Sequence, residues 1–290
     1  MKSSTVLYML LLVRLCSCKG PDNQAGDTKE DLSASSAQAN QNVQEAEQSG
    51  SVSNLDSIYI DNPDGRLCRH FDFHLDSIPT RLVVVQNKIA NKVFFEKETI
   101  FATKPGEIIE FIQIYMDKDK NPGLAYIVTS ASGTLLGKVL GPGEGKWKLF
   151  EGNYHEKICS MRNIQDSSSD FILDLDDKKD TDECKVIEVE LLGVPSYLYF
   201  PKLGQNADKV IHGEQVIWES CGIERLMHCD MYTGRSGQPL LLVVTNNGDQ
   251  DHSYFLEKED GEWKPIDLDK FSNKFKDMIT EFVKLNYQVV

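Results

Sequence analysis

Apolar and polar residues alternate along two short segments that lie far apart in the chain. In Leu67–Leu75 every second residue from Phe71 to Leu75 is apolar, and the residues between them are polar. Ile187–Leu191 repeats this pattern with glutamates at the polar positions. A period of two is typical of an antiparallel strand that is buried on one face. The pattern therefore predicts one such strand in each half of the protein.

Other stretches rich in β-branched and aromatic residues predict further strands. They are Leu82–Gln86, Thr99–Thr103, Glu110–Met116, Leu124–Thr129, Tyr197–Phe200, Gln215–Glu219, Arg225–Tyr232 and Leu240–Thr245. Glycine-rich turns at Gly141–Gly145 and Glu259–Gly261 are expected to precede two strands that contain Trp147 and Trp263. We expect both tryptophans to pack a helix against the sheet.

A helix is expected at the end of each half. Apolar residues from Phe271 to Phe282 recur at i, i+4, i+7, i+8 and i+11, which is typical of a helix with one buried face. Asp267 or Asp269 is placed to cap its start. A shorter counterpart begins near Tyr154. The expected fold class is α+β, mainly antiparallel β, in which each half is a twisted sheet with a C-terminal helix.

The two halves also share residues in the same order. Each second residue follows its match by 116 or 117 positions. The matches are Cys68 and Cys184, Pro79 and Pro195, Ala90 and Ala207, Tyr115 and Tyr232, Pro122 and Pro239, and Trp147 and Trp263. This period is too long for a solenoid unit. We therefore expect two tandem homologous domains, at residues 54–165 and 170–285, each with its own core.

The N-terminal residues predict secretion. An apolar run at Val6–Val13 follows Lys2, and small residues near Cys18 permit cleavage before Lys19. Residues 1–18 are therefore expected to be a signal peptide, although Leu15–Cys18 also fits a lipoprotein box with Cys18 as the lipidated residue. The run is too short to span a bilayer. Residues 19–53 contain no aromatic side chain and many polar ones, which predicts a disordered polar arm.

Charge and composition restrict the partners. The formal net charge is −14, which disfavours nucleic acid and anionic membranes as partners. Hydrophobic residues make up 40% of the chain, as in ordinary soluble proteins. No later stretch is long and apolar enough for a transmembrane segment.

Several motifs resemble one known family. They are Asn62–Asp64 before Cys68, the Phe71-x-Phe73 strand, Lys209–Trp218, Gln238–Val244 and Glu259–Lys264. Together they resemble the FAINT domain, frequently associated in Theileria, of secreted piroplasm parasite proteins. The likeness spans about 54–285 and is clearer in the second half, because Phe101 stands where the second half has Trp218. It implies export from the parasite and contact with the host. It implies no agreed activity and no site residues.

The cysteines allow one bridge in the first half. Cys16 and Cys18 leave with the signal peptide, and no remaining pair has the C-x-x-C spacing of a zinc or thioredoxin site. Cys68 begins the sheet and Cys159 lies on the closing helix, so a disulfide between them is predicted if that helix covers the first strands.

Candidate metal and phosphate motifs have simpler interpretations. His70-x-Asp72-x-His74 places three ligand types on one strand face, but the second half has no matching set, which favours a solvated surface. Asp117-x-Asp119-x-Asn121 and Asp174-x-Asp176 lack the rest of a calcium loop, and Trp147 replaces the Ser or Thr of a phosphate loop. We expect exposed turns there, with no metal and no cofactor.

The candidate catalytic residues do not form a recognisable nucleophile–base pair. His228 and Cys229 are adjacent on a predicted strand and should face opposite ways, and His155 lies near Cys159. The residues that the halves share are Pro, Gly, Trp and apolar ones, which build a scaffold. We therefore expect a non-enzymatic secreted parasite protein that presents a binding or antigenic surface to a host or parasite protein. The alternative is a secreted hydrolase or metal-dependent enzyme with its site in one repeat.

Overall fold

The computed structural model describes residues 57–86, 90–163, 169–248 and 250–286. The predicted signal peptide and polar arm, residues 1–18 and 19–53, lie outside these ranges. So does the side chain of His155.

The first repeat contains strands β1 to β9 and helix α2. Their bounds are β1 Ser57–Tyr59, β2 Cys68–Leu75, β3 Ile78–Val85, β4 Lys92–Phe95, β5 Glu98–Ala102, β6 Glu107–Met116, β7 Pro122–Ala131, β8 Thr134–Gly143, β9 Lys146–Leu149 and α2 Tyr154–Cys159. The second repeat contains β10 Ser169–Asp174, β11 Cys184–Leu191, β12 Val194–Pro201, β13 Gln205–His212, β14 Gln215–Glu219, β15 Arg225–Thr233, β16 Pro239–Asn246, β17 Asp251–Glu259, β18 Glu262–Ile266 and α3 Leu268–Asn286.

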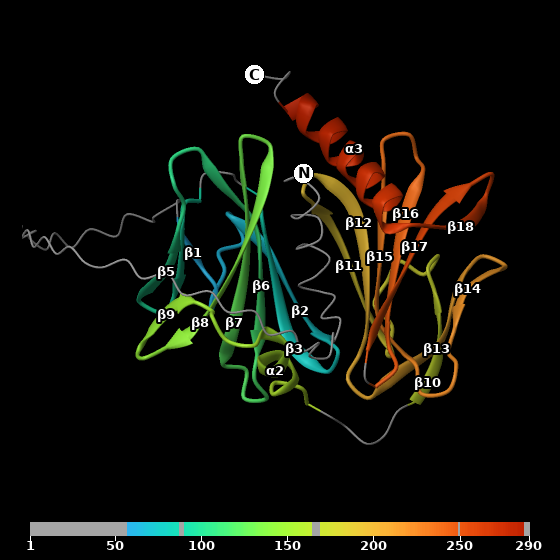
Figure 1. Ribbon diagram of the computed structural model, residues 1–290, viewed down its shortest axis with the longest axis horizontal. Coiled ribbons are helices and arrows are strands. Elements are labelled where there is room, and N and C mark those ends of the chain that lie inside the picture. The colour runs from blue at the N-terminus through green and yellow to red at the C-terminus, as the bar shows by residue number, and fades with distance from the viewer. Residues whose placement is uncertain (1–56, 87–89, 164–168, 249, 287–290) are drawn as a thin grey trace, which may run out of the picture. The chain divides into compact units, whose positions relative to one another are not determined.

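Each repeat pairs a large sheet with a small one (Figure 1). The large sheet is antiparallel and six-stranded, in the order β2-β3-β6-β7-β8-β9 or β11-β12-β15-β16-β17-β18. The small sheet has three strands, β1-β4-β5 or β10-β13-β14, and its first two strands are parallel. The mainly antiparallel fold with two similar repeats confirms the expected class. The small sheets and their parallel pairs were not predicted.

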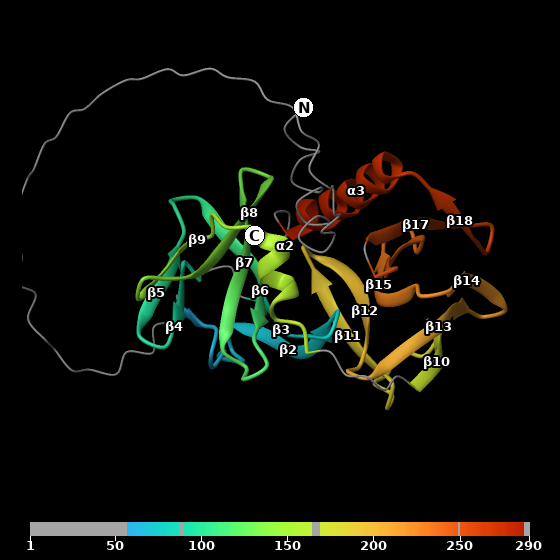
Figure 2. The ribbon, with the colours of Figure 1, turned by 60° about the horizontal axis from the view of Figure 1, so that its bottom comes forward.

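The alternating pattern of β2 and β11 arises because one face of each strand is buried, whereas the polar residues of the other face are largely exposed. Phe73 and Leu75 of β2 enter a shared core, which takes residues from both repeats, and so do Ile187 and Val189 of β11. The opposite face of each large sheet packs on the small sheet of the same repeat, forming a first and a second outer core. Figure 2 shows α3 on one side of the second large sheet and β13 and β14 on the other.

Helix α3 covers the shared core as its apolar stripe predicts. Phe271, Phe275 and Met278 are buried there. The backbone N–H of Lys270 donates to Asp267 Oδ1 at 2.7 Å, so Asp267 rather than Asp269 caps the helix.

The tryptophans correct one prediction. Trp263 is buried in the second outer core and Trp147 packs on the first, so both join the large sheet to the small sheet, on the face away from the helix. Two matched side chains hold them there. The backbone N–H of Trp147 donates to Glu98 Oε1 at 2.7 Å, and the backbone N–H of Trp263 donates to Gln215 Oε1 at 2.8 Å.

The glycine-rich segment before Trp147 is also different from the prediction. Strand β8 continues to Gly143, so the turn is confined to Glu144 and Gly145, which has a φ of 76°. Glycines are tolerated inside this strand because Tyr126 packs directly over Gly137, where a Cβ would lie 2.3 Å from the tyrosine hydroxyl.

The predicted Cys68–Cys159 disulfide is absent. Cys68 is buried in the first outer core, whereas Ile158 of α2 packs against the shared core. The two cysteines therefore belong to opposite faces of the sheet. The prediction was wrong because a helix covers only one face, and Cys68 points to the other.

Candidate functional site

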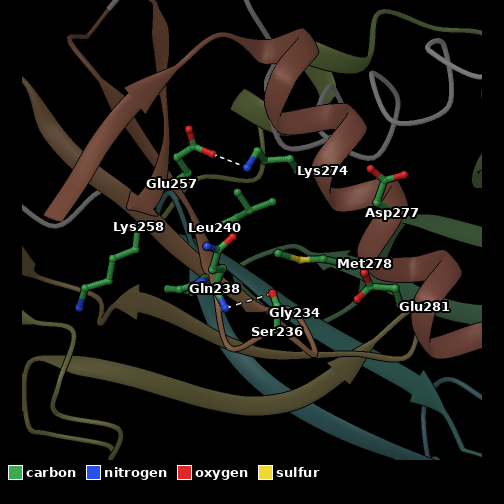
Figure 3. Close-up of a pocket in the computed structure, with 11 residues that line it drawn as sticks. Gly234, Ser236, Gln238, Leu240, Glu257, Lys258, Lys274, Asp277, Met278 and Glu281 are labelled. Atoms are coloured by element: carbon green, nitrogen blue, oxygen red, sulfur yellow. Dashed lines mark hydrogen bonds and ion pairs between the residues drawn. The ribbon is translucent and has the colours of Figure 1, made fainter. Parts of the chain in front are cut away.

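A pocket lies between α3 and the connection from β15 to β16 (Figure 3). This helix–hairpin pocket has a volume of about 130 Å³. It is lined by Gly234, Ser236, Gln238, Pro239, Leu240, Glu257, Lys258, Lys274, Asp277, Met278 and Glu281.

Local sequence explains how these side chains meet. Lys274, Asp277 and Glu281 recur at i, i+3 and i+7, so they form a polar stripe along α3 beside the buried one, to which Met278 belongs. Gly237 takes a φ of 78°, which turns the chain back from β15 into β16 beneath that stripe.

One buried carboxylate organises the charges at the pocket. Glu257 is 7% exposed and contacts the ammonium groups of Lys270 and Lys274, the latter at 2.6 Å. Burial alone would raise the pKa of Glu257, but hydrogen bonds from the two lysines outweigh it and hold this pKa below its usual value. Glu257 therefore stays ionised at neutral pH and fixes Lys274 at the pocket wall.

The rest of the lining is suited to binding. Met278 and Leu240 are buried and give the pocket an apolar base, whereas Asp277 and Glu281 are exposed carboxylates. The residues that line this pocket include no histidine or cysteine. The arrangement offers opposite charges and an apolar surface to one protruding group of a partner.

A second concave surface lies in the first repeat, at the end of β1. This β1 hollow has a volume of about 420 Å³ and is lined by Tyr59, Asp61, Asn62, Pro63 and Asp64. Neither concave surface was predicted from the sequence. The helix–hairpin pocket joins segments that are remote in sequence, whereas the β1 hollow is formed by one short stretch, from Tyr59 to Asp64.

Internal hydrogen bonds show which residues belong to the scaffold of both repeats. Thr80 donates to the carbonyl of Ile78 at 2.9 Å, and Ser196 donates to that of Val194 at 2.8 Å, 116 positions later. A second matched pair joins the threonine of a central strand to a glutamate. These bonds run from Thr129 to Glu107 and from Thr245 to Glu224.

The charged residues of the helix–hairpin pocket, in contrast, differ between the repeats. Three of its charged residues have no charged match in the first repeat. Glu257, Lys258 and Asp277 correspond to Gly141, Pro142 and Ser160, by the same offsets of 116 and 117. The scaffold is shared and the pocket is not.

The residues of the candidate metal motif lie on an outer face of β2. His70 and Asp72 are exposed and His74 is partly buried on β2, and Asp72 pairs with Arg81 at 2.7 Å. Within the described ranges, no group of three or more His, Cys, Asp or Glu is placed to hold a metal ion.

The acidic motifs of the sequence brace turns. Asp117 Oδ1 accepts from the N–H groups of Asp119 and Asn121 at 2.9 and 2.8 Å. Asp174 accepts from the N–H of Asp176 at 2.9 Å.

His228 and Cys229 face opposite sides of β15, as predicted. Cys229 is buried in the second outer core, whereas the ring of His228 lies 5.9 Å from that of Phe200 on the shared-core side. On that side His228 Nε2 lies 3.9 Å from Asp230 Oδ2. The same oxygen accepts a hydrogen bond from the Tyr232 hydroxyl at 3.0 Å. All three side chains are buried. This set lies inside the core rather than at a pocket.

Among the helices in the described ranges, none is both long and apolar enough to cross a bilayer.

These features define a class: a tandem-repeat, mainly antiparallel β protein in which every repeat pairs a six-stranded sheet with a small three-stranded one. Within it, residues 172–249 match the family model of FAINT, a domain of unknown function (DUF529). The match begins in β10 and extends past β16. This part of the second repeat is therefore similar to the FAINT domain, which confirms the resemblance for residues 172–249. Comparisons with curated proteins and with solved structures gave no match.

Proposed function

We propose that this protein is a secreted, non-enzymatic parasite protein whose paired repeats present a binding surface to a host protein. One observation carries the proposal: the two repeats keep the same scaffold contacts but differ at their surface pockets. A shared scaffold with a pocket that differs between the copies suits recognition of a partner, because surface residues can change while the fold is kept.

The helix–hairpin pocket is the proposed contact in the second repeat. Its volume of about 130 Å³ is below the roughly 300–1,000 Å³ of ordinary small-molecule sites. That size suits a single side chain that protrudes from a protein partner. Lys274 is held by Glu257, and the exposed carboxylates Asp277 and Glu281 remain available for a basic side chain.

Secretion is proposed from the apolar N-terminal run and from the likeness to exported FAINT-domain proteins. It is tested by recovering the protein from the culture medium of the parasite and sequencing its N-terminus. A protein in the medium whose chain begins near Lys19 supports secretion. A protein that stays inside the cell and still begins with Met1 contradicts it.

Binding is tested with fluorescently labelled mature protein on host cells. We expect saturable binding that excess unlabelled protein competes away. The double variant Asp277→Lys/Glu281→Lys should weaken binding at least tenfold. The matched control Glu262→Lys reverses an exposed charge on β18, away from the pocket, and should bind normally. Absence of saturable binding, or equal loss in the control, contradicts the proposal. So does turnover of a host component by the purified protein.

A further inference from the structure

The β1 hollow carries an exposed aromatic surface. The rings of Tyr59 and Phe94 stack at 5.1 Å between centroids and 20° between planes. Tyr59 is 38% exposed and lines the hollow, although most aromatic side chains here lie in the cores. Phe94 supports one side of the tyrosine ring, so the ring is held in place as part of the hollow wall.

Comparison of the repeats separates scaffold from surface in this region. Asp61 accepts from the N–H of Glu96 at 3.3 Å, and Asp176 accepts from that of Gly213 at 3.0 Å in the second repeat. This carboxylate therefore braces the small sheet in both copies.

The aromatic pair is not shared. Tyr59 pairs with Phe94 in the strand register, and the matching pair of the second repeat is Asp174 with Ile211. The small sheet folds without the aromatic residues, so folding does not account for the exposed tyrosine.

Polar groups beside the ring offer both donors and acceptors. Arg66 Nε lies 3.1 Å from each oxygen of Asp64, and Arg66 Nη2 lies 2.6 Å from Oδ2. This pair fixes the Asp64 side chain, which lines the hollow, and neutralises its charge. Asn62 is exposed at the hollow and adds an amide, which both donates and accepts.

We propose that the β1 hollow binds an uncharged saccharide unit. The C–H face of a pyranose ring carries partial positive charge and packs on the negative π-face of Tyr59. Its hydroxyl groups donate and accept at once, which matches the Asp64–Arg66 pair and Asn62. A volume of about 420 Å³ accommodates one sugar ring. An uncharged ligand is favoured over a cation for two reasons. Arg66 compensates the negative charge of Asp64, and the Asp61 carboxylate already accepts a hydrogen bond from the backbone N–H of Glu96. The site is separate from the helix–hairpin pocket.

The experiment titrates the mature protein, labelled with ¹⁵N, with methyl glycosides of glucose, galactose, mannose and N-acetylglucosamine. We expect at least one sugar to shift the amide signals of residues 59–66 saturably, with a Kd on the order of 1 mM. Tyr59→Ala should weaken this binding at least tenfold, whereas Tyr59→Phe, which keeps the ring, should retain it within about threefold.

The matched control is Tyr254→Ala, which removes a tyrosine that is 42% exposed in the second repeat. It should leave sugar binding unchanged, and so should the pocket variant Asp277→Lys/Glu281→Lys. The proposal is overturned if none of the four sugars shifts these signals, or if Tyr59→Phe loses binding as fully as Tyr59→Ala. It is also overturned if Nα-acetyl-lysine methylamide binds there and the sugars do not.

Discussion

Glu257 shows how a single side chain ties a helix to a sheet. It projects from β17, is nearly inaccessible, and contacts two lysines of α3. Because its pKa is held below the usual value in the folded protein, it favours folding above the unfolded-state pKa of about 4.3. That contribution is lost as the pH falls through the lower, folded-state pKa.

Glu257→Gln should therefore lower the free energy of unfolding at pH 7 by about 1–2 kcal/mol, since both lysines are partly exposed. It should also reduce the loss of stability between pH 5 and pH 3. Urea unfolding at several pH values measures both effects. The control Glu259→Gln alters an exposed carboxylate that pairs with Lys264, and should change each quantity less. An unchanged pH dependence in Glu257→Gln would contradict the assignment.

Cysteine reactivity is set by burial. Burial raises the pKa of Cys68 to about 11 and that of Cys184 to about 12, and it raises the pKa of Cys229 well above its usual value. Cys221 is exposed.

At pH 8 we expect iodoacetamide to modify Cys221 of the native mature chain first, and to leave the three buried thiols intact until the protein unfolds. Peptide mass spectrometry gives the order, and Cys221→Ser should remove the fastest phase. Rapid native labelling of Cys229 would show that the second outer core is open.

At the scale of elements, the start of α3 depends on Asp267. Replacing it with Ala removes the acceptor for the Lys270 N–H and should cost about 1 kcal/mol. Thermal unfolding measures this loss. Asp277→Asn, in the middle of the same helix, serves as the control and should be nearly neutral. Equal effects of both changes would mean that Asp267 acts through its charge rather than as a cap.

The contact between small and large sheets depends on Gln215. Its side-chain amide donates to the backbone carbonyl of Trp263 at 2.9 Å and accepts from the backbone N–H of the same residue. Gln215→Ala should cost about 1–3 kcal/mol, because both groups of β18 lose a partner. Glu98 makes only the accepting contact with Trp147, so Glu98→Ala should cost less in the same denaturation assay. The reverse order would contradict this account.

Elements with a clear local pattern were predictable from the sequence. The two-residue period of β2 and β11 and the stripe of α3 follow from one buried face, so each was found. Strand β8 was missed because its glycines look like turn residues until Tyr126 covers Gly137. The helix–hairpin pocket was missed because no local pattern places Gln238 beside Asp277. The match between the repeats identified the scaffold, but the pocket residues are the ones that do not match.

For the whole molecule, the shared core predicts cooperative behaviour. Phe73 of the first repeat stacks on Phe200 of the second, with 4.0 Å between the ring centroids, and both are buried in this core. We expect one unfolding transition in calorimetry. Phe200→Ala should destabilise by about 3–5 kcal/mol and separate the transition into two. The control Phe95→Ala removes an aromatic contact within the first repeat and should keep a single transition. Two transitions in the unaltered protein would contradict this prediction.

The parallel pairs of the small sheets affect how each repeat folds while the chain is being synthesised. Strand β10 leaves the ribosome before β11 and β12, yet its partner β13 follows both of them. The new chain must therefore keep Phe171 and Leu173 without their native neighbours while about thirty more residues are added. Closing that loop costs only a modest entropy, but the apolar strand is exposed during the delay. A recombinant fragment that begins at Cys184, where the large sheet starts, would lack β10 altogether and leave β13 with an unpaired edge.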